Sequence, residues 1–143
     1  MKKLVKLSFL FIFSFILIAC SSGPKTIVIS PDGNQMKYQT TSFEVKAGET
    51  VKLVMKNTAT AEMMKHNVVI LNDNESIDRV GKAALTAPNY LPQDAAILAA
   101  TPMANAGQTT EIEFTAPSTP GKYPYICTFP GHYMMMQGVM IVN

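Results

Sequence analysis

The sequence predicts an all-β protein, a Greek-key β-sandwich that carries a partly helical flap at residues 72–108. Short segments rich in β-branched and aromatic residues recur along the chain and are separated by turn residues, a pattern typical of sandwiches. The interval 72–108 is too long for a structureless loop inside a compact domain. With 143 residues, 48% of them hydrophobic, the chain has enough material for one such domain and an export segment.

The expected strands are short, and turn residues bound several of them. Residues 31–34 read Pro-Asp-Gly-Asn and form a turn cluster, while residues 47–49 make a tight connection between two strands. The strands are predicted at Thr26–Ser30, Met36–Thr40, Ser42–Lys46, Thr50–Lys56, His66–Leu71, Thr109–Thr115, Lys122–Cys127 and Val139–Val142.

The first part of the flap has the spacing of a helix. Asn74 is available as an N-terminal cap, and Pro88 lies beyond the end. Residues 95–100 are ambiguous, because their composition alone favours a helix. The apolar residues that share one helical face are Ile77, Val80, Ala84 and Leu85.

The first nineteen residues have the features of a secretory signal. A basic start with Lys2, Lys3 and Lys6 precedes a predominantly apolar run from Leu7 to Ala19. A membrane-spanning helix needs about 20 apolar residues, so cleavage is favoured over a retained anchor. Because three of the twelve basic residues leave with residues 1–19, nine remain against ten acidic residues. A near-neutral domain without a basic stripe argues against nucleic-acid binding.

The end of that segment, Leu17-Ile18-Ala19-Cys20, resembles the bacterial lipobox, in which the cysteine becomes the lipidated first residue. We therefore expect Cys20 to carry a lipid, residues 20–25 to form a tether and residues 26–143 to form the folded domain. The protein would be exported, anchored to a lipid membrane and facing the periplasm. By the same resemblance, Ser21 after the cysteine suggests onward sorting to an outer membrane if the source has one, and the inner membrane is the alternative.

The chain has two cysteines, and an exported protein would ordinarily join such a pair in a disulfide. Lipidation of Cys20 removes that option. Cys127 would then be a single thiol in an oxidising compartment, where it needs burial or a metal for protection.

The segment from Cys127 to Gly138 places a thiol, an imidazole and a thioether within ten residues. Phe129-Pro130-Gly131-His132 suits a type II turn, which folds the loop back on itself. A thiolate, two imidazoles and a weak axial thioether are the ligands of a blue-copper electron-transfer site. His66 is the one other histidine in the chain, and it opens a separate predicted strand.

The motif CTFPGHYMMMQG resembles the copper loop of azurins and auracyanins, and MKHNVV resembles the strand that supplies their first histidine. The chain is thus similar to the cupredoxin family. The resemblance implies that His66, Cys127 and His132 bind one copper ion and that Met136 is its axial ligand, because Met-Gln-Gly matches the family's Met-Lys-Gly. It also favours a short strand at residues 95–100, which we adopt.

Further roles follow from the same resemblance. Asn67 matches an asparagine that braces the loop, and backbone amides near Asn67 and Phe129 would donate to the Cys127 sulfur, which tunes the potential. In azurins a glycine carbonyl before the first histidine is a distant axial contact. Lys65 occupies this position here, and we expect no close contact from its carbonyl.

Two features leave the subfamily open. The azurin disulfide has no counterpart in this chain, which brings the chain nearer to auracyanins. The spacing of three residues between His132 and Met136 instead follows azurin. The additional methionines Met134, Met135 and Met140 are interpreted as structural.

The predicted function is that of a monomeric single-electron carrier with one copper, cycling between Cu(I) and Cu(II). Its partners would be redox proteins such as cytochromes or respiratory complexes, and Met64 is expected to join an apolar contact patch near His132. The alternative is a periplasmic copper chaperone or storage protein, which the methionine-rich tail suggests. An enzyme is not expected, since copper oxidases and reductases need further histidines and the chain has two.

Overall fold

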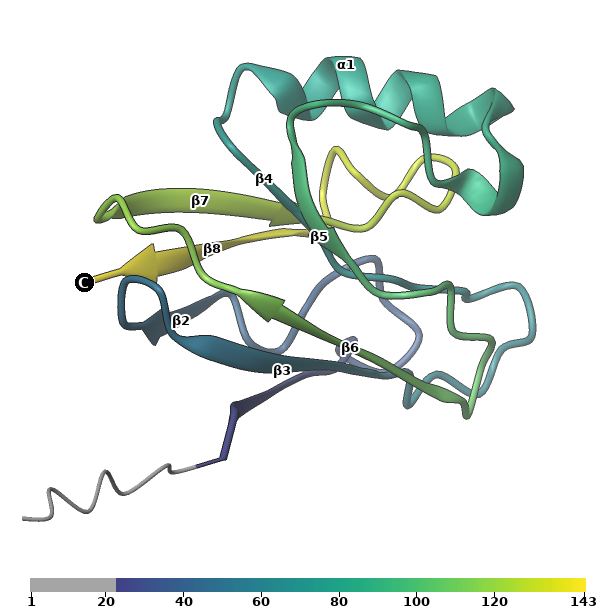
Figure 1. Ribbon diagram of the computed structural model, residues 1–143. Coiled ribbons are helices and arrows are strands. Elements are labelled where there is room, and N and C mark those ends of the chain that lie inside the picture. The colour runs from purple at the N-terminus through teal and green to yellow at the C-terminus, as the bar shows by residue number, and fades with distance from the viewer. Residues whose placement is uncertain (1–22) are drawn as a thin grey trace, which may run out of the picture.

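Two β-sheets packed face to face form the body of the protein in a computed structural model, which describes residues 23–143 (Figure 1). One sheet has three strands in the order β1-β3-β6, and the other has five in the order β2-β8-β7-β4-β5. The predicted all-β sandwich is confirmed. The strands are β1 (Lys25–Ile29), β2 (Ser42–Val45), β3 (Thr50–Lys56), β4 (Val69–Leu71), β5 (Ile97–Ala100), β6 (Thr109–Thr115), β7 (Gly121–Ile126) and β8 (Gln137–Val142).

The core lies between the sheets and is built from alternating side chains of both. In β2 the pattern is strictly alternating, so that Phe43 and Val45 are buried while their neighbours face solvent. The strand β4 is buried throughout because the flap covers its other face. Tyr125 packs against Tyr38 with ring centroids 5.3 Å apart, which joins the strand β7 to the segment before β2.

The predicted strand at residues 36–40 is wrong. Apart from one isolated bridge between Pro31 and Tyr38, this segment pairs with no strand. It turns back on itself instead, because the backbone N–H of Asp32 donates to the Lys37 carbonyl at 2.8 Å and Gly33 adopts a positive φ of 58°. Residues of high strand propensity remain irregular where no neighbouring strand offers a ladder of hydrogen bonds.

The predicted strand from residue 66 begins three residues later, at Val69. His66 itself forms an isolated bridge with Ala104, in which the two residues exchange backbone hydrogen bonds of 3.1 and 2.8 Å. The histidine is therefore held by the backbone of the last part of the flap, after β5. The other predicted strands are confirmed to within one or two residues at their ends.

The flap is partly helical, as predicted. It contains α1 (Ser76–Ala83), two single 3₁₀ turns, η1 (Ala84–Thr86) and η2 (Pro88–Tyr90), and then the strand β5, which confirms the short strand expected within residues 95–100. Val80 and Ala84 are buried under α1, but Leu85 is 54% exposed. Its expected place on the buried face is wrong because the chain tightens into the 3₁₀ turn at Ala84.

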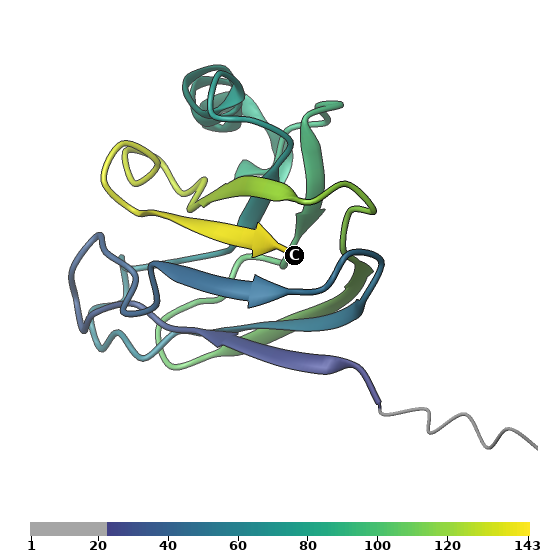
Figure 2. The ribbon, with the colours of Figure 1, turned by 90° about the vertical axis from the view of Figure 1, so that its left-hand side faces the viewer.

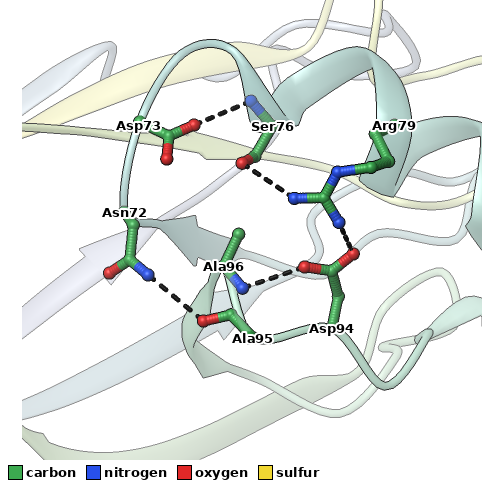
Figure 3. Close-up of polar contacts among 7 residues, drawn as sticks. All are labelled: Asn72, Asp73, Ser76, Arg79, Asp94, Ala95 and Ala96. Carbon is green, nitrogen blue, oxygen red and sulfur yellow. Dashed lines mark hydrogen bonds and ion pairs between the residues drawn. The ribbon is translucent and has the colours of Figure 1, made fainter.

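The cap of α1 is also different from the expectation. The side chain of Asp73, and not that of Asn74, accepts the backbone N–H of Ser76 at 2.8 Å, so the carboxylate serves the open end of the helix (Figure 3). One residue earlier, the Asn72 amide donates to the Ala95 carbonyl at 3.1 Å. These bonds fix the first and last parts of the flap to each other.

A group of polar contacts that we call the flap clasp closes the flap on its outer side (Figure 3). It is formed by Ser76, Arg79, Asp94 and Ala96. The Arg79 guanidinium pairs with the Asp94 carboxylate and donates to the Ser76 hydroxyl at 3.1 Å. The second Asp94 oxygen accepts the backbone N–H of Ala96 at 2.9 Å. The clasp therefore connects α1 with the turn before β5.

The described chain begins at the end of the sandwich opposite to the loop 127–136 (Figure 2). The strand β1 runs parallel to β3. Lys25 lies beside Val51, near the start of β3, and Ile29 lies beside Met55, near its end. Within residues 23–143 no helix has the length and apolarity to cross a membrane. The predicted signal at 1–19 and the predicted lipidation of Cys20 lie outside the described residues.

Candidate metal centre

A loop between β7 and β8, residues 127–136, carries three of the four predicted ligands, and we call it the ligand loop. It begins at Cys127, directly after β7, and its backbone closes where the N–H of Cys127 donates to the Met136 carbonyl at 3.1 Å. The predicted type II turn is confirmed. The N–H of His132 donates to the Phe129 carbonyl at 3.0 Å, and Gly131 has the positive φ of 82° that the turn requires at its third position.

The structure brings together His66, Cys127 and His132, although His66 is 61 residues distant from Cys127. The Cys127 Sγ lies 3.7 Å from the His66 Nδ1 and 3.6 Å from the His132 Nδ1, and all three donor atoms are within 4.8 Å of one another. The two sulfur-to-nitrogen separations are short enough for one ion to bridge each pair with bonds of about 2.0–2.3 Å, the usual length for imidazole nitrogen and thiolate sulfur.

Met136, the fourth predicted ligand, is fully buried and belongs to the same core cluster as Cys127. Its backbone N–H donates to the His132 carbonyl at 2.8 Å, and its carbonyl accepts from Cys127. The backbone of Met136 is therefore fixed to the other two predicted ligands of the loop. Met134 and Met135 behave differently, since 64% and 67% of their surfaces are exposed.

Asn67 connects the ligand loop to the framework. Its side-chain amide donates to the Thr128 hydroxyl at 2.8 Å, and its side-chain oxygen accepts the Thr128 backbone N–H at 2.9 Å. The buried Tyr38 hydroxyl in turn donates to the Asn67 carbonyl at 2.6 Å. The roles of Tyr38 and Thr128 were missed from the sequence, where nothing distinguishes a tyrosine in a turn region or a threonine inside the motif.

A second buried asparagine, Asn57, holds the segment that leads to His66. Its side-chain amide donates to the Met64 carbonyl at 2.7 Å and to the Ala104 carbonyl at 3.0 Å. Ala104 is the residue that bridges with His66. Sequence reasoning missed Asn57 as well, because one of its partners, Ala104, is 47 residues away in the sequence. Lys65, between Met64 and His66, is half-buried.

Burial keeps both imidazoles neutral. It lowers the pKa of His66 to about 4, with a smaller contribution from the neighbouring His132, and it also lowers the pKa of His132. A neutral imidazole has a free nitrogen lone pair, which a metal ion needs. Both rings are thus available as ligands throughout the neutral range.

Two effects shift the pKa of the Cys127 thiol in opposite directions. Burial raises its pKa to about 11, whereas hydrogen bonds from the backbone N–H groups of Asn67 and Phe129 act to lower it. A thiol in such a place stays protonated in the absence of a cation, and a bound metal ion favours the thiolate. The two amides are already placed to receive the negative charge.

The far nitrogen of His66, Nε2, is buried without a hydrogen-bond partner, and it is the one such side-chain nitrogen or oxygen within residues 23–143. Ligand histidines usually donate this N–H to a second group. Leaving it unpaired costs about 1–3 kcal/mol, which a metal bond at Nδ1 can offset. The soft and borderline donors, the neutral rings and the buried setting fit a copper ion.

Aromatic rings of the ligand loop pack against the flap at two places. The ring of Phe129 lies edge-on to His132 with centroids 4.9 Å apart, and Tyr90 lies edge-on to Phe129 at 5.3 Å. The ring of Tyr133 sits directly over Gly81 of α1, where a side chain at Gly81 would overlap with it. The flap therefore supports the loop from outside the sandwich.

Comparison with known proteins agrees with this geometry. Residues 25–143 match the family of copper binding proteins described as plastocyanin/azurin. The chain belongs to this family. Auracyanin-A of Chloroflexus aurantiacus is 42% identical over 127 residues, which cover 85% of this chain and 76% of that protein. Azurin of Pseudomonas fluorescens biotype C is 33% identical over 127 residues, covering 83% and 98%.

A solved structure supports the same assignment. That of auracyanin A, a "blue" copper protein, has a TM-score of 0.78 and 40% sequence identity to this cupredoxin, covering 85% of this chain and 100% of that one. The predicted family, the fold, the copper cofactor and the electron-carrier function are thereby confirmed at the level of the family.

Proposed function

We propose that this cupredoxin carries single electrons between redox proteins outside the cytoplasm, with one copper ion held by His66, Cys127, His132 and Met136. The observation that carries the proposal is the cluster of three buried donor atoms within 4.8 Å of one another. A copper ion with this ligand set alternates between Cu(II) and Cu(I) and makes no change to covalent bonds.

The framework supports rapid electron transfer by preventing the ligands from moving. Asn67 fixes the ligand loop through two hydrogen bonds to Thr128, and Asn57 fixes the segment before His66. Because Cu(I) and Cu(II) prefer different geometries, a site that relaxes toward neither needs little rearrangement when an electron moves. The amides at Asn67 and Phe129 stabilise the thiolate sulfur and thus contribute to the reduction potential.

Met136 is proposed as the weak axial ligand because it is buried beside Cys127, whereas Met134 and Met135 face solvent. The carbonyl of Lys65 is proposed to remain outside bonding range. Glycine's backbone freedom, which accompanies the distant carbonyl contact in azurins, is absent at this position.

His132 is the proposed exit for electrons, since it lies in the loop at the surface end of the site and is 4% exposed, compared with 0% for His66. The exposed methionines Met63, Met134 and Met135 flank the two ligand segments, and Met64 is half-buried beside them. A small apolar patch of this kind suits brief encounters with partners such as cytochromes or respiratory complexes.

The lipobox-like segment supports a tether to a membrane through Cys20, on the periplasmic side. The described chain begins at the end of the sandwich opposite to the ligand loop (Figure 2). A domain anchored there can present His132 to partners while the lipid holds it. Cys20→Ala should move the protein from the membrane to the soluble fraction and leave its spectrum unchanged; persistent membrane attachment would mean that the apolar segment is retained.

Electron transfer without catalysis is favoured over enzymatic activity because residues 23–143 contain one such cluster of donor atoms and the chain has two histidines in total. Copper delivery or storage is the alternative. Delivery requires exchangeable ligands, while the three donors here are buried and the loop is hydrogen-bonded to its framework.

Optical and paramagnetic resonance spectra of the copper-loaded mature protein test the proposal. We expect an intense blue absorption in the oxidised state from charge transfer between the thiolate and Cu(II), its loss on reduction, and one copper per chain. A colourless Cu(II) protein, or one from which a chelator removes copper within minutes, would instead support delivery or storage.

A further inference from the structure

Methionine is unusually exposed at the end of the molecule that holds the copper centre. Of the ten methionines in the chain, four within residues 23–143 expose more than a third of their surface. Burial in the core cannot explain these side chains. They are Met36 at 38%, Met63 at 75%, Met134 at 64% and Met135 at 67%.

Three methionines from distant parts of the chain line one surface cavity of about 450 Å³, which we call the thioether cavity. Met36 comes from the turn before β2, Met64 precedes His66 by two residues, and Met135 belongs to the ligand loop. The remaining lining is provided by Asn34, Gln35 and Lys37.

The segments around this cavity are fixed by hydrogen bonds. The side-chain oxygen of Asn34 accepts the backbone N–H groups of Thr60 and Ala61 at 2.9 and 3.1 Å, which ties the turn carrying Met36 to the segment carrying Met64. The N–H of Met64 donates to Ala61 at 2.9 Å. These hydrogen bonds therefore fix the position of Met64 relative to the turn that carries Met36.

The ligand loop supplies the third side of the cavity. The backbone N–H of Met135 donates to the His132 carbonyl at 3.0 Å, and the N–H of Met136 donates to the same oxygen. This short turn places Met135 outside the buried site while Met136 lies inside it. The thioether cavity and the copper centre are thus neighbours that share the loop but no side chain.

The chemistry of the lining selects one kind of ligand. Thioethers are soft donors that suit Cu(I), and the cavity offers no carboxylate for hard divalent ions and no imidazole for Cu(II). Lys37 is the single charged group in the lining and opposes a cation, but its exposure to solvent lets salt screen that repulsion.

We propose that the thioether cavity is a second copper site, which binds Cu(I) through Met36, Met64 and Met135. This site is separate from the electron-transfer centre and open to solvent, so the ion it holds can exchange. The inference is independent of the proposed electron transfer, which requires none of these three sulfur atoms. A surface for partner contact would need apolar side chains only, and leucine would serve as well as methionine.

Silver(I), a redox-inert substitute for Cu(I), provides the test on the complete mature protein with its copper centre loaded and reduced. With methionine methyl groups labelled by carbon-13, one equivalent of Ag(I) should shift the signals of Met36, Met64 and Met135 together. The signals of Met63 and Met134, which are exposed outside this cavity, should stay in place. Copper content and the blue colour after reoxidation should be unchanged, which shows that the buried site has not been displaced.

Competition with a chromogenic Cu(I) chelator measures the affinity. Met135→Leu and Met36→Leu should each weaken binding of the second Cu(I) equivalent at least tenfold, and the matched exposed controls Met63→Leu and Met134→Leu should alter it less than twofold. These replacements conserve volume and apolar character, so folding is retained. Absence of a second equivalent, equal shifts at all exposed methionines, or full binding by Met135→Leu would overturn the proposal.

Discussion

The ligand loop and the flap are both long connections on the same side of the sandwich, but they are stabilised in opposite ways. Buried, uncharged hydrogen bonds from Asn67 hold the loop, while the Cys127 sulfur and the two imidazole nitrogens face one another. The flap clasp is centred on the ion pair of Arg79, whose side chain is exposed, with Asp94, and its polar groups satisfy each other. A functional site needs rigid donors with unused bonding capacity, whereas a supporting element needs satisfied ones.

The ligand loop and the flap are in contact at two places. Tyr90 of the flap packs against Phe129, and Tyr133 of the loop packs over Gly81. Through these contacts the flap can stabilise the loop, although it contributes no predicted ligand. Changes in the loop should alter the copper site itself, and changes in the flap should alter mainly the stability.

The largest effect is expected from the loop. Cys127→Ala should abolish the blue absorption completely, because the charge transfer requires the thiolate sulfur. Asp94→Asn, the matched change in the clasp, should retain the full colour. Absorption spectra of both copper-loaded variants decide the matter, and a blue Cys127→Ala protein would disprove the ligand assignment.

Within the loop, the buried and exposed methionines should differ sharply. Met136→Leu should keep copper and colour but raise the reduction potential, since loss of a thioether donor destabilises Cu(II) more than Cu(I). Met134→Leu and Met135→Leu should leave the potential nearly unchanged. Voltammetry on the three variants measures this, and a shift confined to Met134 or Met135 would show that another methionine is the axial ligand.

A buried uncharged contact should contribute more stability than an exposed charged one. Asn67→Ala leaves the backbone N–H of Thr128 buried and unpaired, which should lower the free energy of unfolding by about 1–3 kcal/mol. Arg79→Ala removes a pair in which the arginine side chain is 58% exposed and the aspartate side chain 12%, at a cost of about 1 kcal/mol, the upper end for surface pairs. Urea titrations of the metal-free proteins measure the free energy of unfolding of both variants. A larger decrease for Arg79→Ala than for Asn67→Ala would contradict this expectation.

The packing of the flap against the loop can be tested at Gly81. Alanine in an open helix stabilises by about 1 kcal/mol relative to glycine, but here its methyl group would overlap with the Tyr133 ring. Gly81→Ala should therefore lower the free energy of unfolding by about 1 kcal/mol, as measured by thermal unfolding. Gly121→Ala, where the nearest atom lies at an ordinary 3.6 Å, is the control. A stabilised Gly81→Ala protein would show that Tyr133 moves aside freely.

The smallest effect is a pH dependence in the flap. Hydrogen bonds from the hydroxyl and then the backbone N–H of Ser76 hold the pKa of Asp73 below its ordinary value of 3.8. A lowered folded pKa contributes stability that is complete above the ordinary pKa and is lost as the pH falls through the lowered one. Asp73→Asn should thus be slightly less stable than wild type at pH 7, and the difference in urea midpoint should shrink below about pH 3.8. A difference independent of pH would exclude the carboxylate charge as its cause.

The sequence by itself determined the local features of this protein. The ligand loop was predictable because its turn depends on Pro130 and Gly131, whose backbone preferences are local, and because Cys127, His132 and Met136 are only nine residues apart. Most strands were predictable for the same reason, since alternation of apolar residues is a property of each segment. Resemblance to cupredoxins supplied His66 as the partner of this loop.

Only the tertiary structure decided which distant groups meet. Residues 36–40 have strand composition but find no neighbouring strand, and Leu85 leaves the buried face because the helix tightens at Ala84. Tyr38, Asn57 and the thioether cavity depend on contacts between segments 26 or more residues apart or across the sandwich. Such contacts arise from how the sheets pack, and a pattern within one segment carries no information about them.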